Sequence, residues 1–146
     1  MKHAHLRIFV AGTGFTGSRI LNQLSFAGHQ VVGMNRSGFC ADVQPSFSLV
    51  AGDVLKSDGL DALSSLEPFD LMISTLSGSS LRDPEAYRSL YVDGPRRIAE
   101  ALKWKEDPMV WALGSTGVYG EEDGEWVSEK TPAHPPHQKG QVQLDA

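Results

Sequence analysis

The sequence is poor in cysteine and lacks any long apolar run. Cys40 is the only cysteine among 146 residues, which excludes an internal disulfide and a cysteine-rich zinc site and fits a reducing cytoplasm. No apolar run approaches the roughly 18 residues of a membrane span. The first apolar run stops at Gly12 and is too short for the core of a signal peptide. We therefore expect a cytoplasmic protein that does not enter membranes.

Positive charge is also scarce. The chain carries 13 Lys and Arg against 18 Asp and Glu, a net charge of −5 at pH 7, so it is not built to bind phosphate backbones non-specifically. We expect no nucleic-acid partner. With 40% hydrophobic and 21% charged residues, the composition is that of a folded protein. A chain of this length is expected to form one domain, here residues 1–146.

Five short apolar runs predict buried strands. Each run is apolar on both faces and is bounded by glycine or polar residues, as is typical of parallel strands. The runs lie at residues 6–10, 31–34, 47–51, 71–73 and 109–113.

Helical spacing of apolar residues predicts the segments between the strands. One helix of about three turns follows the first strand and ends near Gly28. A second starts at Asp83-Pro84, where aspartate caps and proline suits the first turn, and breaks near Gly94-Pro95. Strands that alternate with helices predict βαβ units, and therefore an α/β fold with a parallel sheet.

The character of the chain changes after Gly120. An acidic run is followed by a proline-rich stretch, so we expect residues 121–141 to be rich in loops. The final stretch, 142–146, has helical character but is expected to be too short to bury anything, and the chain is expected to end within an element. The three tryptophans, Trp104, Trp111 and Trp126, are interpreted as packing residues.

A glycine-rich segment directly follows the first predicted strand. It matches the pattern G-x-G-x-x-G between a strand and a helix, where the glycines permit a tight turn, close approach of a pyrophosphate and packing of helix on strand. The alternative is a glycine-rich turn that binds no ligand; a P-loop is disfavoured because no Gly-Lys-Ser/Thr follows. The candidate cofactor-binding residues here are Gly12, Thr13, Gly14, Phe15, Thr16 and Gly17.

The acidic residue that usually ends the second strand of a dinucleotide fold is missing. Asn35 stands in its place and Arg36 follows. Because arginine pairs with a 2′-phosphate and no carboxylate repels that phosphate, NADP is favoured over NAD, although NAD remains possible. The alternative for Arg36 is a solvated loop residue. After the third strand, Asp53 and Val54 are candidates to contact the adenine, with a turn cap as the alternative role of Asp53.

The segment 114–120, Gly-Ser-Thr-Gly-Val-Tyr-Gly, follows the fifth predicted strand. Together with residues 12–17, 52–54 and 129–132, in this order, it resembles the extended short-chain dehydrogenase/reductase superfamily, the NAD-dependent epimerase/dehydratase group. The resemblance implies a Rossmann-like doubly wound parallel sheet that binds NAD(P), truncated here before the substrate-binding region. It also implies a catalytic hydroxyl at Ser115, which hydrogen-bonds a substrate oxygen while a tyrosine transfers the proton.

The sequence departs from that family where the tyrosine belongs. Its Tyr-x-x-x-Lys motif should fall on residues 139 and 143, which are Lys139 and Gln143. Glutamine has no proton to transfer near neutral pH, so the usual proton relay is absent. Tyr91 and Pro95 likewise replace an asparagine and a threonine of the family's helix. These changes resemble the atypical branch of the superfamily, whose members keep the fold and lose or relocate active-site residues.

Two further groups are candidates for the missing chemistry. Tyr119 is a phenol on the same loop as Ser115, with packing of that loop as the alternative role. His134 and His137 stand in a proline-rich loop, where solvation is a simpler interpretation than catalysis, and no third ligand of clear spacing accompanies them. We expect no metal site.

Two functions are compatible with these residues. The first is an NADP(H)-dependent oxidoreductase or epimerase-like enzyme that acts on a carbonyl or sugar-nucleotide substrate. The alternative is a non-catalytic NADP(H)-binding sensor or scaffold that has lost the Tyr-x-x-x-Lys pair. In either case we expect a nucleotide cofactor and a small-molecule ligand as partners. This chain by itself is expected to bind nucleotide without turning over substrate, because orienting both reactants supplies much of the rate.

Overall fold

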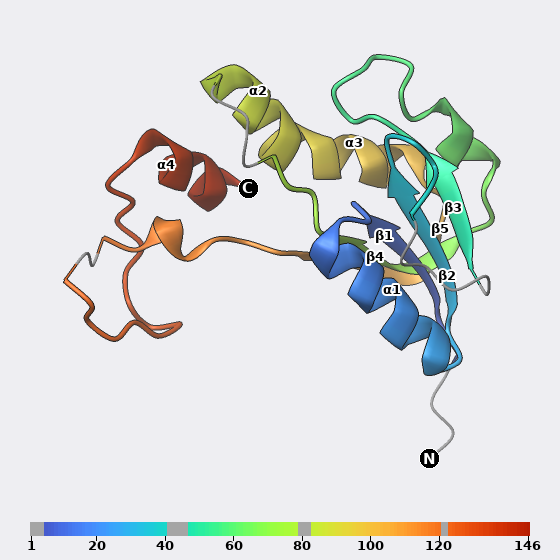
Figure 1. The fold of residues 1–146 in the computed structure, drawn as a ribbon, viewed down its shortest axis with the longest axis horizontal. Helices are drawn as coiled ribbons and strands as arrows, with labels where there is room; N and C mark the ends of the chain where they lie inside the picture. Colours follow the sequence, from blue (N-terminus) through green and yellow to red (C-terminus); the bar gives the residue numbers. More distant parts are fainter. Residues whose placement is uncertain (1–4, 41–46, 79–82, 121–122) are drawn as a thin grey trace.

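Five parallel strands form one sheet in the order β3-β2-β1-β4-β5 (Figure 1). The computed structural model describes residues 5–40, 47–78, 83–120 and 123–146. Two strands lie on one side of β1 and two on the other, which is the doubly wound Rossmann-like arrangement, so the predicted fold class is confirmed. The strands are β1 (Arg7–Ala11), β2 (Gln30–Asn35), β3 (Ser48–Ala51), β4 (Phe69–Ser74) and β5 (Trp104–Ala112).

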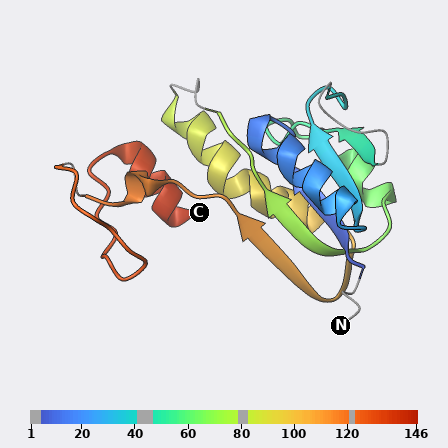
Figure 2. The same ribbon diagram turned by 60° about the horizontal axis from the view of Figure 1, so that its bottom comes forward.

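Helices cover both faces of this sheet (Figures 1 and 2). Alternate side chains of β1 point to opposite faces, as strand geometry requires. Ile8 packs with Leu21 of α1 on one face, and Phe9 packs with Ile98 of α3 on the other. The helical elements are α1 (Phe15–Phe26), η1 (Asp61–Ser65), α2 (Pro84–Arg88), η2 (Ser89–Asp93), α3 (Gly94–Ala101), η3 (Thr116–Val118) and α4 (Gln138–Asp145), of which η2 is a π-helical turn.

The helical segment between β4 and β5 begins and breaks as its sequence predicts. The Asp83 carboxylate accepts hydrogen bonds from the amides of Glu85 and Ala86, at 3.2 and 3.3 Å, and so caps α2. The break takes the form of η2, one turn before Pro95. Pro95 has no amide hydrogen to donate to the carbonyl four residues earlier, and a wider turn relieves that mismatch. This turn places Leu90 and Tyr91 beside the functional site described below.

The strand β5 differs from its prediction. It is longer than expected and largely exposed: Met109, Val110 and Trp111 have exposed fractions of 42, 51 and 57%. It pairs with β4 along one edge, and among the described residues no further strand pairs with the other edge. The packing role expected of Trp111 is therefore wrong in this structure, as is that of the fully exposed Trp126.

The C-terminal segment also differs from its prediction. A helix, α4, begins at Gln138, inside the segment expected to be loop-rich, whereas residues 123–137 contain no helix or strand. It buries Gly140 and Val142, contrary to the expectation that this stretch is too short to bury anything. A short helix becomes stable when it packs on a partner, and α4 packs on η3 and α2.

A carboxylate at the start of β4 joins three strands. Asp70 Oδ2 accepts a hydrogen bond from the Arg7 amide at 2.6 Å and one from the Lys105 ammonium at 2.7 Å. The Arg7 amide first, and then Lys105, lower the pKa of Asp70. Because the charged form makes these bonds, the stability that they contribute is present above the usual aspartate pKa and is lost as the pH falls through the lowered one.

We expect Asp70→Asn to reduce the free energy of unfolding at pH 7 by about 1 kcal/mol, the usual net worth of such bonds. The difference between the wild-type protein and the variant should shrink as the pH falls from the usual aspartate pKa of the unfolded chain through the lowered pKa of Asp70 in the folded one. Denaturant unfolding of the full-length protein at pH 7 and at pH 3 measures both values. A difference that is equal at the two pH values would contradict the assignment.

Candidate functional site

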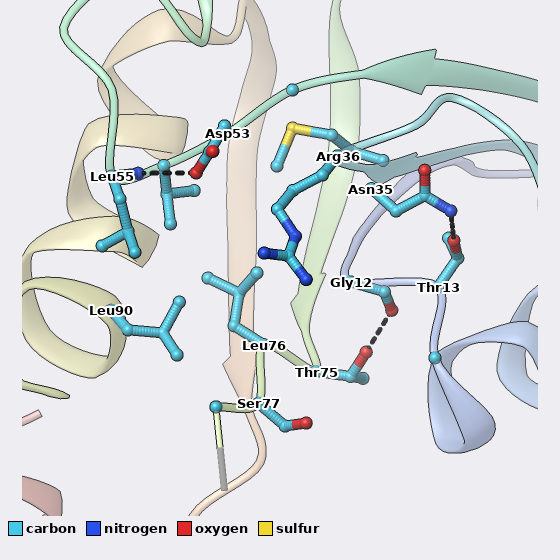
Figure 3. A pocket seen from close by; sticks show the side chains of 15 residues that line it. Gly12, Thr13, Asn35, Arg36, Asp53, Leu55, Thr75, Leu76, Ser77 and Leu90 are labelled. Atoms are coloured by element: carbon cyan, nitrogen blue, oxygen red, sulfur yellow. Dashed lines mark hydrogen bonds between the residues drawn. The ribbon is translucent and has the colours of Figure 1, made fainter. Parts of the chain in front are cut away.

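A cavity of about 280 Å³ lies at the carboxyl ends of the strands (Figure 3). In the order β3-β2-β1-β4-β5 the chain leaves β1 toward β2 on one side and later returns to β4 on the other. Ligands of doubly wound sheets bind at such a point, where the loops after β1 and β4 separate. The cavity is lined by Gly12, Thr13, Gly14, Met34, Asn35, Arg36, Gly52, Asp53, Val54, Leu55, Thr75, Leu76, Ser77, Gly78 and Leu90.

The glycine turn after β1 has the geometry that its sequence predicts. Gly12 has a φ of +91°, which L side chains rarely adopt. At Gly17 a Cβ would lie 1.8 Å from the Gly12 carbonyl oxygen, so helix α1 approaches the turn as closely as its backbone allows. Around Gly14, in contrast, no heavy atom lies within 4 Å of an added Cβ. The first and third glycines of the motif are therefore required by the fold, and the second leaves space for a ligand.

The N-terminus of α1 is suited to an anion. Gly14 is the N-cap and supplies no side-chain hydrogen bond, and the first turn contains no acidic residue. The amides of a first helical turn have no partner within the helix and carry a positive partial charge. The guanidinium of Arg19 lies 3.6 Å from the centre of the Phe15 ring, which brings a full positive charge to the same turn. Phe15 itself is 77% exposed.

The side chain of Asn35, at the end of β2, organises the loop that follows it. Its amide nitrogen donates to Thr13 Oγ1 at 2.5 Å and to the Phe39 carbonyl at 2.8 Å. Its oxygen accepts bonds from the amides of Ser37 and Gly38 and from the Ser37 hydroxyl. An aspartate here would lack the two donated bonds. The asparagine thus belongs to the architecture of the loop.

The side chain of Arg36 extends from this loop into the cavity (Figure 3). It is exposed, and the residue before it is the neutral Asn35. Asp53 and Val54 line the same cavity after β3. Asp53 Oδ1 accepts a hydrogen bond from the Leu55 amide at 3.1 Å, so this residue does form the predicted turn while it also faces the cavity. The structure therefore brings all three of these sequence candidates to one place.

The segment after β4 forms part of the site, although the sequence prediction did not include it. Thr75 Oγ1 donates to the carbonyl oxygens of Gly12 at 2.5 Å and Ala11 at 3.2 Å. These bonds attach the glycine turn to the segment that follows β4. The residues 75–77 line this cavity and the one beside it. The signal for them is topological: β4 neighbours β1, so the segment that follows β4 must adjoin the glycine turn.

A second cavity, of about 290 Å³, lies on the other side of the turn. It shares Gly14 and residues 75–77 with the first cavity, so the two cavities adjoin each other at the glycine turn. Ser115 lines it, and its Oγ accepts a hydrogen bond from the Gly117 amide at 3.1 Å. The other lining residues are Phe15, Thr16, Gly17, Tyr87, Tyr91, Leu113, Gly114 and Gln143.

Packing of α4 on η3 places two of its side chains against α2. A Cβ at Gly140 would lie 2.2 Å from the Gly117 carbonyl oxygen, so glycine permits this close packing. The Lys139 ammonium then lies 5.1 Å from the centre of the Tyr87 ring, and Gln143 Nε2 donates to Tyr87 Oη at 3.2 Å. The two positions where the resemblance implies tyrosine and lysine therefore both face a tyrosine from another helix.

The carboxylate of Asp145 fastens the end of α4 to α2. It accepts a bond from Arg88 at 2.7 Å and one from Gln141 at 2.9 Å. The Arg88 bond, followed by the Gln141 bond, lowers the pKa of Asp145. The bond between Asp145 and Arg88 and the close packing of Gly140 together hold α4 in the position where Gln143 lines the second cavity.

The remaining candidates lie elsewhere. Tyr119 is half-buried at the end of η3 and lines neither of these two cavities. His134 and His137 are exposed. In the part of the chain that the structure describes, no three His, Cys, Asp or Glu side chains gather as they would around a metal ion. Within the same residues, no helix is both long and apolar enough to cross a membrane.

Comparison with known proteins agrees with this geometry. The family model described as NAD dependent epimerase/dehydratase matches residues 8–140. The UDP-glucose 4-epimerase of Mycolicibacterium smegmatis is 30% identical over an aligned length of 151 residues. The alignment covers 94% of this chain and 48% of that protein. This chain therefore spans about half the length of that relative.

Two solved structures show the same fold. The UDP-glucuronic acid 4-epimerase of Bacillus cereus, in complex with NAD, superposes with a TM-score of 0.71 at 23% identity and covers 96% of this chain and 49% of its own. The UDP-N-acetylglucosamine 4-epimerase of Methanobrevibacter ruminantium, in complex with UDP-N-acetylmuramic acid, gives 0.74 at 19%, with 96% and 47% covered. The family match extends from β1 to the start of α4. It includes the glycine turn, which adjoins both cavities, and the segment that contains Ser115. This chain belongs to the NAD dependent epimerase/dehydratase family.

Proposed function

We propose that this chain is the NADP(H)-binding part of an oxidoreductase or epimerase-like enzyme that acts on a carbonyl or sugar-nucleotide substrate. The observation that carries the proposal is the position of Arg36, which projects into the first cavity beside the neutral Asn35. Arginine pairs with a phosphate in a bidentate manner, and a 2′-phosphate is what distinguishes NADP from NAD.

The residues fit such a cofactor along its length. The first cavity takes the adenosine, with Asp53 and Val54 toward the adenine and Arg36 toward the 2′-phosphate. The open space at Gly14 and the N-terminus of α1 suit the pyrophosphate. A bound nicotinamide supplies or accepts a hydride. Ser115 lines the second cavity and is proposed to hydrogen-bond the substrate oxygen.

The substrate class is proposed from the relatives. The Mycolicibacterium smegmatis and Bacillus cereus proteins are both named as epimerases of UDP-sugars, and the structure of the second contains NAD. We extend to this chain a nicotinamide cofactor and a carbonyl or sugar-nucleotide substrate. The proposed preference for NADP rests on Asn35 and Arg36 of this chain and not on the relatives.

The test is Arg36→Ala in the full-length protein. We expect the Kd for NADPH to rise about 10- to 100-fold, the loss of a charge-assisted pair with a phosphate, and the Kd for NADH to change less than about threefold. Calorimetric titration with both nucleotides measures the two values. An equal loss for both cofactors, or tighter binding of NADH than NADPH by the wild-type protein, would overturn the NADP assignment.

A second function is favoured by Lys139 and Gln143, which stand where the family resemblance implies the tyrosine and the lysine. A chain without that pair is suited to bind a nucleotide without transferring a proton, as a sensor or scaffold. Saturable NADPH binding by the full-length protein, with no oxidation of NADPH across a panel of carbonyl compounds and UDP-sugars, would select this alternative.

A further inference from the structure

The second cavity contains a phenol whose position the linear sequence does not reveal. Tyr87 belongs to α2, is 9% exposed and lines this cavity together with Ser115. Gln143 lies 56 residues later in the chain and lines the same cavity, and its amide donates to the Tyr87 hydroxyl oxygen at 3.2 Å. A phenol from one helix and an amide from another thus form a hydrogen-bonded pair at the wall.

Two contacts, besides the Gln143 bond, hold the Tyr87 side chain in one orientation. The Tyr91 ring packs against it, with centroids 4.4 Å apart and planes inclined by 39°. The Lys139 ammonium lies on the ring at 5.1 Å from its centre. Tyr91 is itself held, because its hydroxyl oxygen accepts a bond from the Gly78 amide at 3.1 Å. A preorganised hydroxyl binds a ligand with little further loss of conformational entropy.

The bond between Tyr87 and Gln143 uses only part of the donors and acceptors that the two side chains carry. A phenol both donates and accepts, and the Gln143 bond uses only the acceptor side of Tyr87. A glutamine side chain carries two N–H donors and a carbonyl acceptor, and this bond uses one donor. Neighbouring groups that both donate and accept match the vicinal hydroxyl groups of a ribose, which also do both.

Resting on the proposed function, we propose that Tyr87 and Gln143 form a ribose-binding pair, which holds the ribose on the nicotinamide side of a bound dinucleotide. The two cavities adjoin at Gly14 and share residues 75–77, which supports this placement. An extended ligand with its adenosine in the first cavity and its pyrophosphate at the N-terminus of α1 enters the second cavity with its other half. There Tyr87 and Gln143 offer neutral hydrogen-bonding groups to the second ribose.

The experiment compares two nucleotides that differ in the half that carries the nicotinamide and its ribose. NADP+ contains the second ribose, whereas adenosine 2′,5′-bisphosphate retains the adenine, its ribose and the 2′-phosphate but lacks the second ribose. We expect Tyr87→Phe and Gln143→Leu in the full-length protein each to raise the Kd for NADP+ about fivefold to tenfold. The Kd for adenosine 2′,5′-bisphosphate should stay within about twofold, because neither side chain lines the first cavity.

Tyr119→Phe is the matched control, because it also removes a phenol hydroxyl but at a position outside both cavities. We expect it to leave both dissociation constants unchanged. If Tyr87→Phe and Gln143→Leu leave NADP+ binding unchanged, or weaken both nucleotides equally, the ribose-binding pair is wrong while the nucleotide site stands. If the wild-type protein binds neither nucleotide, the proposed function itself fails. Thermal unfolding of each variant without ligand separates a loss of contact from a loss of folding.

Discussion

Replacing Gly14 by valine should abolish nucleotide binding and leave the fold intact. The fold tolerates the side chain because Gly14 has a φ of −76° and no heavy atom lies within 4 Å of an added Cβ. The same open space is where a pyrophosphate must approach the backbone. We expect the Kd for NADPH to rise at least about 100-fold, the loss of several charge-assisted bonds, with a change in the free energy of unfolding below about 0.5 kcal/mol.

Two measurements on the full-length protein check this result. Calorimetry measures the Kd, and thermal unfolding with and without NADPH measures whether the nucleotide still stabilises the folded state. A Gly14→Val protein that binds NADPH within threefold of the wild-type value would remove the glycine turn from the site, and with it the basis of the proposed function.

Gly17→Ala is the informative comparison in the same motif. Here a Cβ would lie 1.8 Å from the Gly12 carbonyl oxygen and 2.6 Å from Thr75 Oγ1. Helix α1 must move away from the turn to accept it, so we expect a loss of about 2 kcal/mol of stability together with weaker binding. Substitution of Gly14 should thus reduce ligand binding, whereas substitution of Gly17 should reduce the stability of the fold. The pattern G-x-G-x-x-G does not distinguish these two effects.

Local patterns predicted the central part of the fold. The runs that became β1, β2 and β4 are apolar on both faces because helices cover both faces of the sheet there. The Asp83 cap and the break caused by Pro95 also follow from neighbouring residues alone. The glycine turn was predictable because Gly12 and Gly17 answer steric requirements of the turn itself, and Gly14 leaves the open space that the pattern implies for a ligand.

Contacts between distant residues account for what local patterns missed. The sequence marks Gln143 only as a departure from the family motif and does not mark Tyr87, and the two form a pair only when α4 packs on α2. The stretch 142–146 is too short to be stable by itself, and the contact of α4 with η3 that stabilises it is recognised only in three dimensions. The exposure of Trp111 on β5 depends on what covers the strand, and a hydrophobic side chain carries no information on that point.

Gly140→Ala should destabilise α4, although alanine normally stabilises a helix by about 1 kcal/mol relative to glycine. The added Cβ would lie 2.2 Å from the Gly117 carbonyl oxygen and 2.7 Å from the Pro135 Cβ, so α4 cannot keep its present contact with η3. We expect the backbone amides of residues 138–145 to exchange hydrogen at least about tenfold faster, corresponding to about 1.4 kcal/mol of local stability.

Hydrogen exchange measured by mass spectrometry on the full-length protein tests this reversal of sign. Gln138→Ala is the control, because it introduces alanine at an exposed position in the first turn of the same helix and should leave exchange nearly unchanged. Displacement of α4 also separates Gln143 from Tyr87, so Gly140→Ala should weaken NADP+ more than adenosine 2′,5′-bisphosphate, as Tyr87→Phe does. Slower exchange in Gly140→Ala would show that α4 does not depend on its contact with Gly117, and the position of the ribose-binding pair would lose its structural basis.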